Sequence, residues 1–211
     1  MKTYLFDFDG TLVDSMPTFV SVMLRILDEN GIKYPDDVVK TITPLGYHGT
    51  AKYFIELGVK MKLEEITAKM TEYATRAYRD EIGEKTGVID TLKKLKARGD
   101  DLNILTASPH TMLDPCLKRL GIYELFTNVW SCDDFGTTKA DPEIYRAAAK
   151  RMGVEVEDVI FLDDNLSADT TAKSAGVTVV GVYDESSKDF ESEMKATCHR
   201  YVYTLSELLE D

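Results

Sequence analysis

Residues 3 to 15 read TYLFDFDGTLVDS, a short apolar run that ends in closely spaced acids. The aromatic-rich residues 4–6 predict a buried strand. Because strand side chains alternate, Asp7 and Asp9 are expected to point the same way. Two carboxylates at the end of a buried strand raise each other's pKa unless a cation intervenes, and their hard oxygens suit Mg²⁺. We therefore expect a metal site here; the alternative is an ordinary turn, in which Asp and Gly10 are common.

The next part of the chain, residues 15–83, has helical patterning and no strand pattern. Apolar residues recur there at helical spacing. Helices are expected over 15–30, 36–41, 50–57 and 63–80. The break Pro44–Thr50, which contains two glycines, is expected to be a loop between helices, and residues 83–87 resemble a linker.

After residue 87 helical and strand patterns alternate. Strands are expected over 102–105, 128–132, 159–162, 177–182 and 201–203, and helices over 88–96, 112–120, 141–152 and 167–175. Such alternation predicts an α/β fold with a parallel sheet that is covered on both faces. Ligands bind beyond the carboxyl ends of the strands in such sheets. We expect residues 1–14 and 84–211 to form the catalytic core, and residues 15–83 to form a helical cap above the site.

Polar residues follow several of the expected strands. Thr106 offers a hydroxyl beside the backbone N–H of Ala107, a natural contact for a phosphate, although helix capping is the commoner role of such a residue. Lys139 precedes a helix that begins near Pro142; a lone lysine in a loop is usually a surface residue. Asp163 and Asp164 end the strand expected over 159–162.

These motifs, taken in order, resemble those of the haloacid dehalogenase superfamily of phosphotransferases. The first motif, Asp-x-Asp-Gly-Thr, is matched from Asp7 onward. The resemblance implies a Rossmann-like core with an all-helical cap, in the branch of phosphoglycolate phosphatases and β-phosphoglucomutases. It also implies that Asp7 is the nucleophile, that Thr106 binds the phosphoryl group and that Lys139 holds this group beside Asp7. The dehalogenase branch lacks the second aspartate of the first motif, so Asp9 argues against dehalogenation.

The fourth motif shows one departure from the family pattern. Asp164 matches the principal Mg²⁺ ligand, and Asp163 matches an acidic variant of the position before it. Many relatives carry a further aspartate four residues after the principal ligand, where this chain has Ala168. Its acid stands one place later, at Asp169, which is rotated by about 100° on a helix. We expect Asp169 to face elsewhere.

The resemblance implies a two-step reaction. Mg²⁺ would be bound by Asp7, the backbone carbonyl of Asp9 and Asp164, with Asp163 beside them. Asp7 would attack phosphorus and form an aspartyl-phosphate. Asp9 would protonate the leaving oxygen and then take a proton from the water that hydrolyses the intermediate. We expect a phosphatase that acts on a small phosphorylated metabolite; the alternatives are a sugar-phosphate mutase of the β-phosphoglucomutase type and a non-enzymatic binding protein.

Substrate choice is expected to depend on the break at 44–50. In relatives with such a cap, a loop between cap helices reaches into the site, and Gly46 and His48 are the candidate contacts here; a plain helix–helix turn is the alternative. The loop contains no arginine, which counts against the mutase branch, whose cap grips a second phosphate with one.

Charge and cysteine content exclude several other classes of protein. The formal net charge of −12 argues against nucleic acid and anionic membranes as partners. The first residues lead straight into the first motif without the layout of a signal peptide. The three cysteines have neither disulfide-like nor zinc-like spacing. We expect a cytoplasmic protein that is a monomer or weak dimer.

Overall fold

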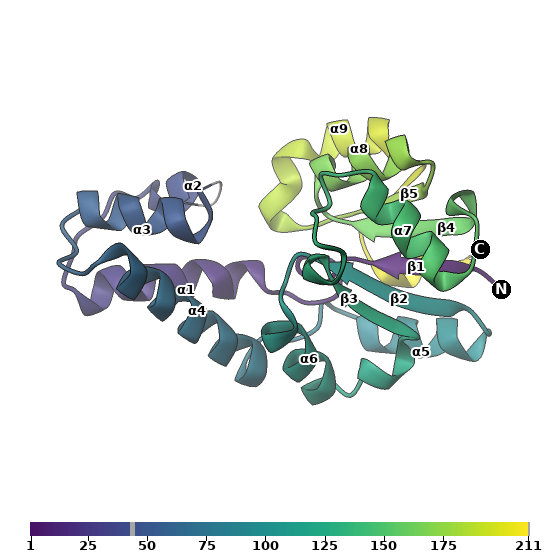
Figure 1. The fold of residues 1–211 in the computed structure, drawn as a ribbon, viewed down its shortest axis with the longest axis horizontal. Coiled ribbons are helices and arrows are strands. Elements are labelled where there is room, and N and C mark those ends of the chain that lie inside the picture. Colours follow the sequence, from purple (N-terminus) through teal and green to yellow (C-terminus); the bar gives the residue numbers. More distant parts are fainter. Residues whose placement is uncertain (43–44, 211) are drawn as a thin grey trace. The chain divides into compact units, whose positions relative to one another are not determined.

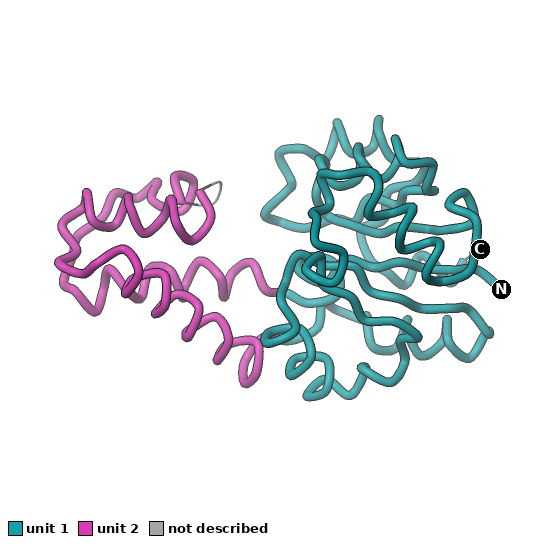
Figure 2. The backbone as a smooth tube through the Cα atoms, viewed as in Figure 1, with its two compact units in different colours: residues 1–14, 83–211 teal, residues 15–82 magenta. Residues whose placement is uncertain are grey.

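The computed structural model describes residues 1–42 and 45–210. The chain divides into two compact units, one formed by residues 1–14 with 83–211 and the other by residues 15–82 (Figure 2). Each unit has its own hydrophobic core. Among the described helices, none has the length and apolar character that crossing a bilayer requires.

The larger unit is built on a six-stranded sheet in which all pairings are parallel. The strand order is β3-β2-β1-β4-β5-β6, with β1 and β4 at the centre. The strands are β1 Thr3–Phe6, β2 Asp101–Thr106, β3 Asn128–Ser131, β4 Val159–Asp163, β5 Thr178–Val182 and β6 Arg200–Val202. The expected parallel α/β sheet is confirmed.

Helices cover both faces of this sheet (Figure 1). They are α5 Val88–Ala97, α6 His110–Arg119, α7 Glu143–Met152, α8 Leu166–Ala175 and α9 Glu191–Thr197. In Figure 1, α7, α8 and α9 lie on one side of the strands, and α5 and α6 lie on the other. The core between the sheet and α7 contains an edge-to-face pair of rings, Tyr145 and Phe161, with centroids 5.0 Å apart. Parallel strands buried on both faces explain why β1 and β4 are nearly all apolar.

The smaller unit is all helical. It consists of α1 Met16–Glu29, α2 Val38–Ile42, α3 Gly46–Glu56 and α4 Leu63–Asp80. Met23, Ile26 and Leu27 of α1 share one buried core with Ile66 and Met70 of α4, as their helical spacing predicts.

The expected start of the helix over 50–57 was wrong by four residues. Helix α3 begins at Gly46 rather than Thr50, so Gly46 and His48 lie in its first turn and not in a loop; Pro44 falls outside the described residues. Gly49 lies inside this helix and does not break it. An added Cβ there would lie 2.9 Å from the Cβ of Leu45, so a larger residue would require a shift of Leu45. Helix α6 begins at His110, two residues before the expected start. Pro115 lies inside it, as expected, where the helix lacks one backbone donor.

One element was not expected at all. Helix α9, Glu191–Thr197, has a single buried residue, Met194. Seven residues with one apolar anchor leave too little periodicity for a helix to be recognised from the sequence.

Candidate active site

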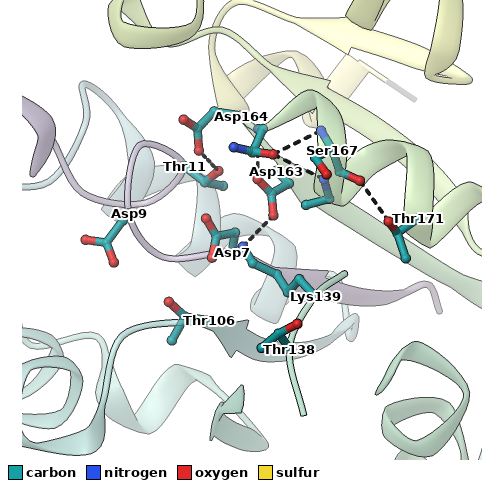
Figure 3. A network of polar contacts seen from close by, with 12 residues as sticks. Asp7, Asp9, Thr11, Thr106, Thr138, Lys139, Asp163, Asp164, Ser167 and Thr171 are labelled. Carbon is teal, nitrogen blue, oxygen red and sulfur yellow. Dashed lines mark hydrogen bonds and ion pairs between the residues drawn. The ribbon is translucent and has the colours of Figure 1, made fainter. Parts of the chain in front are cut away.

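The register of the central strands brings two acids side by side. Phe6 of β1 pairs with Leu162 of β4, and the next backbone N–H, that of Asp7, donates to the carbonyl of Leu162 at 2.8 Å. Asp7, which follows β1, and Asp163, the last residue of β4, therefore lie at the same level of neighbouring strands. Both are buried, and one carboxylate oxygen from each lies within 4.8 Å of one from Asp164 (Figure 3).

Burial and mutual repulsion make this acidic triad, Asp7, Asp163 and Asp164, costly without a cation. Burial, followed by the charge of Asp163, raises the pKa of Asp7 to about 7. The same two causes, in the same order, raise the pKa of Asp164 well above its ordinary value. A divalent cation would favour the charged form of each group.

Lys139 supplies one positive charge to the triad. Its Nζ atom lies 2.7 Å from Oδ1 of Asp7 and 2.6 Å from Oδ2 of Asp163. Burial opposes the charge on the ammonium, but the two carboxylates outweigh it and raise the pKa of Lys139. One lysine cannot neutralise three carboxylates, so the residues present fit a divalent cation bound through oxygen. The lysine is therefore paired with two of the three acids and is not a solvated surface side chain.

Gly10 and Thr11 hold Asp164 against the turn that follows β1. Gly10 has φ +74°, and a Cβ at this position would lie 2.4 Å from Oδ2 of Asp164. The hydroxyl of Thr11 donates to Oδ1 of the same carboxylate at 3.2 Å. Because only glycine tolerates both the positive φ and the close approach, the Asp-Gly-Thr part of the motif has a direct structural reason.

The carboxylate of Asp9 does not join the triad. Strand β1 ends at Phe6, so side-chain alternation no longer governs the residues beyond it, and the expectation that Asp7 and Asp9 point the same way was wrong (Figure 3). The Asp9 carboxylate accepts a hydrogen bond from the hydroxyl of Ser108, which follows β2. One aspartate of the motif is therefore buried with the other acids, and the second is held beside the loop after the neighbouring strand.

Thr106 lies at the carboxyl end of β2, where its side chain is buried. Its Oγ1 accepts a hydrogen bond from the backbone N–H of Ser108 at 3.1 Å. This is the local turn bond that hydroxyl side chains commonly form, and the hydroxyl proton can still be donated to an anion. Ala107, the next residue, is exposed in the same loop.

Two residues that the sequence did not single out support these groups. The hydroxyl of Tyr145 is 3.1 Å from the carbonyl of Lys139 and 3.2 Å from that of Ala168, so it joins the loop before α7 to helix α8. Lys85 bonds the carbonyl of Gly10. The bonds from Tyr145 to Ala168 and from Lys85 to Gly10 have no local sequence signal, because each joins residues that are distant in the chain.

Asp169 is turned toward the core of the larger unit. Its side chain is fully buried, and Oδ2 accepts a hydrogen bond from the thiol of Cys198 at 3.1 Å. Oδ1 has no hydrogen-bond partner among the described residues. Burial, followed by the charge of Asp163, raises the pKa of Asp169 to about 8. Lys139 and Asp7 are the other charged groups that act on it.

We expect Asp169→Asn to gain thermal stability relative to the wild type as the pH rises from 6 to 9. Because its pKa is raised, the protonated carboxyl group of Asp169 stabilises the folded protein at low pH, and this contribution is lost as the pH rises through about 8. Asparagine has no such loss. The measurement is the difference in Tm between variant and wild type across this range. Asp189→Asn, which removes an exposed carboxylate, controls for net charge, and an equal Tm difference at every pH would contradict the prediction.

The remaining candidates, Gly46 and His48, are exposed residues of the helical unit. Their expected contact with substrate stays a prediction. The larger unit brings Asp7, Asp163, Asp164 and Lys139 into one group. Asp9, in the turn after β1, and Thr106, the last residue of β2, lie next to this group (Figure 3).

Comparison with known proteins agrees with this arrangement. The model of the haloacid dehalogenase-like hydrolase family matches residues 4–182. A phosphorylated carbohydrates phosphatase of Thermotoga maritima is 28% identical over 178 residues, which cover 84% of this chain and 82% of the relative. Phosphoglycolate phosphatase 1 of Pseudomonas aeruginosa is 28% identical over 183 residues, covering 83% of this chain and 67% of the relative.

A solved structure shares the fold over the whole chain. It is that of a proposed β-phosphoglucomutase of Thermotoga maritima, with a TM-score of 0.87 and 27% identity, covering 100% of this chain and 97% of that one. The match to the family model contains the first acidic motif and extends to the end of β5. The chain therefore belongs to the haloacid dehalogenase-like hydrolases, in the branch that includes phosphoglycolate phosphatases and β-phosphoglucomutases.

Proposed function

We propose that this enzyme is a Mg²⁺-dependent phosphatase that hydrolyses a small phosphorylated metabolite through an aspartyl-phosphate on Asp7. The observation that carries the proposal is the separation of the two motif aspartates. Asp7 is buried in the triad, and its ion pair with Lys139 favours the charged, nucleophilic form of its carboxyl group. Asp9 is held outside the triad by Ser108, in a position suited to exchange protons. The names of the relatives from Thermotoga maritima and Pseudomonas aeruginosa support the class of substrate.

Asp7, Asp164 and Asp163 would hold the metal ion, with the backbone carbonyl of Asp9 as a further ligand. Bound Mg²⁺ would offset the negative charge of the triad and of the phosphate. Lys139 would add a second positive charge beside Asp7. The hydroxyl of Thr106 and the backbone N–H of Ala107 would donate to the remaining phosphate oxygens.

In the first step, a carboxylate oxygen of Asp7 forms a bond to phosphorus while the bond from phosphorus to the substrate oxygen breaks. That oxygen receives the proton of Asp9. In the second step, Asp9 accepts a proton from water, the water oxygen bonds to phosphorus, and the bond to Asp7 breaks. Asp7 is then free for the next turnover. Dividing a difficult displacement in this way is the advantage of covalent catalysis.

We further propose that Gly46 and His48 contact the part of the substrate that lies beyond the phosphate. We expect the reaction in the cytoplasm, whose reducing conditions suit three cysteines that are all free thiols. We also expect an enzyme that works as a monomer or weak dimer.

A sugar-phosphate mutase is the second candidate, because the proposed β-phosphoglucomutase shares the fold at a TM-score of 0.87. Both reactions begin with phosphorylation of Asp7. They differ in what happens next, since a mutase returns the phosphoryl group to a sugar phosphate and protects it from water.

The test is phosphate release from a panel of sugar phosphates, phosphoglycolate and other small phosphomonoesters, with Mg²⁺ and with EDTA. We expect Mg²⁺-dependent release with one preferred substrate class. Wild-type enzyme and Asp9→Asn are compared, and the variant is expected to lose roughly 100-fold or more, as removal of a general acid commonly does. Rapid phosphorylation of Asp7 by a sugar bisphosphate without phosphate release would establish the mutase. Mg²⁺-independent release would contradict both.

A further inference from the structure

Lys85 makes three contacts that no step of the proposed reaction uses. Its Nζ atom lies 2.5 Å from the carbonyl oxygen of Gly10, 2.5 Å from that of Tyr183 and 3.0 Å from Oδ2 of Asp184. An ammonium group has three donors, so these contacts occupy all of them. The side chain of Lys85 is 19% exposed and that of Asp184 is 6% exposed. The contact is therefore an interior tie and not a surface ion pair.

The tie joins two loops that flank the loop after β4. Gly10 follows β1, Tyr183 follows β5, and β4 lies between these strands in the sheet. Asp164, which follows β4, is thus enclosed between the two loops that Lys85 connects. The backbone N–H of Lys85 also donates to the carbonyl of Leu12 at 3.0 Å, which fixes the lysine to the same turn that contains Gly10.

Asp184, the carboxylate that pairs with Lys85, is itself held in place by hydrogen bonds. Oδ1 of Asp184 accepts hydrogen bonds from the backbone N–H and the hydroxyl of Ser186, at 2.9 and 2.6 Å. Burial alone would raise the pKa of Asp184, but the bonds from Ser186 and the charge of Lys85 outweigh it and lower the pKa. The carboxylate therefore stays charged and keeps the ammonium in place.

We propose that Lys85 is a positioning residue that holds the Gly10 turn against Asp164 and so sets the geometry of the metal site; this inference rests on the proposed function. The link is short. Lys85 fixes the Gly10 carbonyl, and Gly10 touches the Asp164 carboxylate so closely that a Cβ has no room. Thr11, the next residue, donates to the same carboxylate. Without the tie, the turn can move away and Asp164 loses both neighbours that orient it.

A second ion pair at the opposite end of the sheet offers a matched control. Nε of Arg98 lies 2.6 Å from Oδ2 of Asp100, whose side chain is 2% exposed, and that of Arg98 is 33% exposed. Arg98 also reaches the hydroxyl of Tyr4 at 3.1 Å, in β1. Like Lys85, it pairs with a buried carboxylate near an end of β1, but it lies at the end away from the triad.

The experiment measures the Mg²⁺ dissociation constant by isothermal titration calorimetry for wild type, Lys85→Met and Arg98→Met, with Tm alongside. We expect both variants to lose stability. We expect Lys85→Met alone to bind Mg²⁺ about 10- to 100-fold more weakly, the usual cost of removing a group that orients a ligand. Its phosphatase activity should recover as the Mg²⁺ concentration is raised. If both variants lose stability and both keep the wild-type Mg²⁺ affinity, Lys85 only stabilises the fold and the proposal is overturned.

Asp184→Asn provides a milder change if Lys85→Met does not fold, since it removes the charge that pairs with Lys85 and leaves the lysine present. Weaker Mg²⁺ binding in this variant supports the proposal, and wild-type affinity overturns it. These measurements distinguish a failure of the proposal for Lys85 from a failure of the proposed phosphatase function. A wild-type protein that binds Mg²⁺ but releases no phosphate refutes the proposed function, while the comparison of Mg²⁺ affinities still decides the role of Lys85. A wild-type protein that binds no Mg²⁺ refutes both.

Discussion

Asp7→Asn is expected to abolish phosphate release and, at the same time, to make the metal-free protein more stable above pH 7. Asparagine retains the shape of the side chain but cannot act as the nucleophile that we propose, so the proposed covalent step is lost. Removal of such a residue commonly costs roughly 10⁴-fold or more in kcat. We expect this loss with every substrate of the wild-type enzyme.

The gain in stability follows from the pKa of Asp7, which burial and the charge of Asp163 raise to about 7. A raised pKa means that the stability contributed by the protonated group is lost as the pH rises through that value. The asparagine side chain carries no charge at any pH, so above pH 7 the variant avoids this loss. Lys139 keeps its contact with Asp163 at 2.6 Å, so the substitution does not leave a buried ammonium unpaired.

The measurement is Tm at pH 8 in EDTA, together with phosphate release in Mg²⁺. We expect the Tm of Asp7→Asn to exceed that of the wild type by about 3 °C or more, which is roughly the effect of 1 kcal/mol in a chain of this size. Asp9→Asn is the control, because Asp9 lies outside the triad and bonds Ser108. It should lose activity with a smaller gain in Tm, since the charge of Asp9 contributes less to the raised pKa of Asp7 than burial and Asp163 do. A lower Tm for Asp7→Asn at pH 8 would show that the triad does not repel itself as described.

Gly10→Ala should reduce kcat/KM by about 100-fold or more, well beyond what its loss of stability explains. A Cβ at this position would lie 2.4 Å from Oδ2 of Asp164, so either the turn or the carboxylate has to move. Displacement of a catalytic group by about 1 Å commonly costs 100-fold. The positive φ of +74° adds backbone strain of roughly 1–2 kcal/mol for a residue with a side chain.

Gly153→Ala separates the two effects. Gly153 ends helix α7, has the same φ of +74°, and would place its Cβ in open space. Both alanine variants should therefore lose a similar amount of stability to backbone strain, and only Gly10→Ala should lose activity. Comparable activity in the two variants, measured with saturating Mg²⁺, would mean that the approach of Gly10 to Asp164 has no part in catalysis.

Much of the fold could be predicted because its signals are local. The apolar runs of β1 and β4 and the acids that end them lie within a few residues of one another, and parallel pairing places those ends at one edge of the sheet. The helices of the smaller unit follow from apolar residues at helical spacing. These features depend on neighbours in the sequence, so the sequence alone contains them.

The features that could not be predicted depend on distant contacts or on where an element ends. The direction of Asp9 depends on β1 ending at Phe6, and strand ends are poorly marked in a sequence. Lys85 lies in a stretch with the composition of a linker, and its partners Gly10 and Asp184 are 75 and 99 residues away. Gly49 is typical of a break between helices, yet it lies inside α3.

The helical unit leaves and rejoins the larger unit at almost the same point. The backbone N–H of Asp14 donates to the carbonyl of Gly83 at 3.0 Å, and Val13 pairs with Glu84 in an antiparallel bridge. The two ends of the insertion are therefore adjacent, because backbone hydrogen bonds join the residues just before it to those just after it. An insertion with adjacent ends can be lengthened, shortened or exchanged at little entropic cost to its host. The insertion can therefore change in sequence and length while the sheet, and the acids at its edge, stay unchanged.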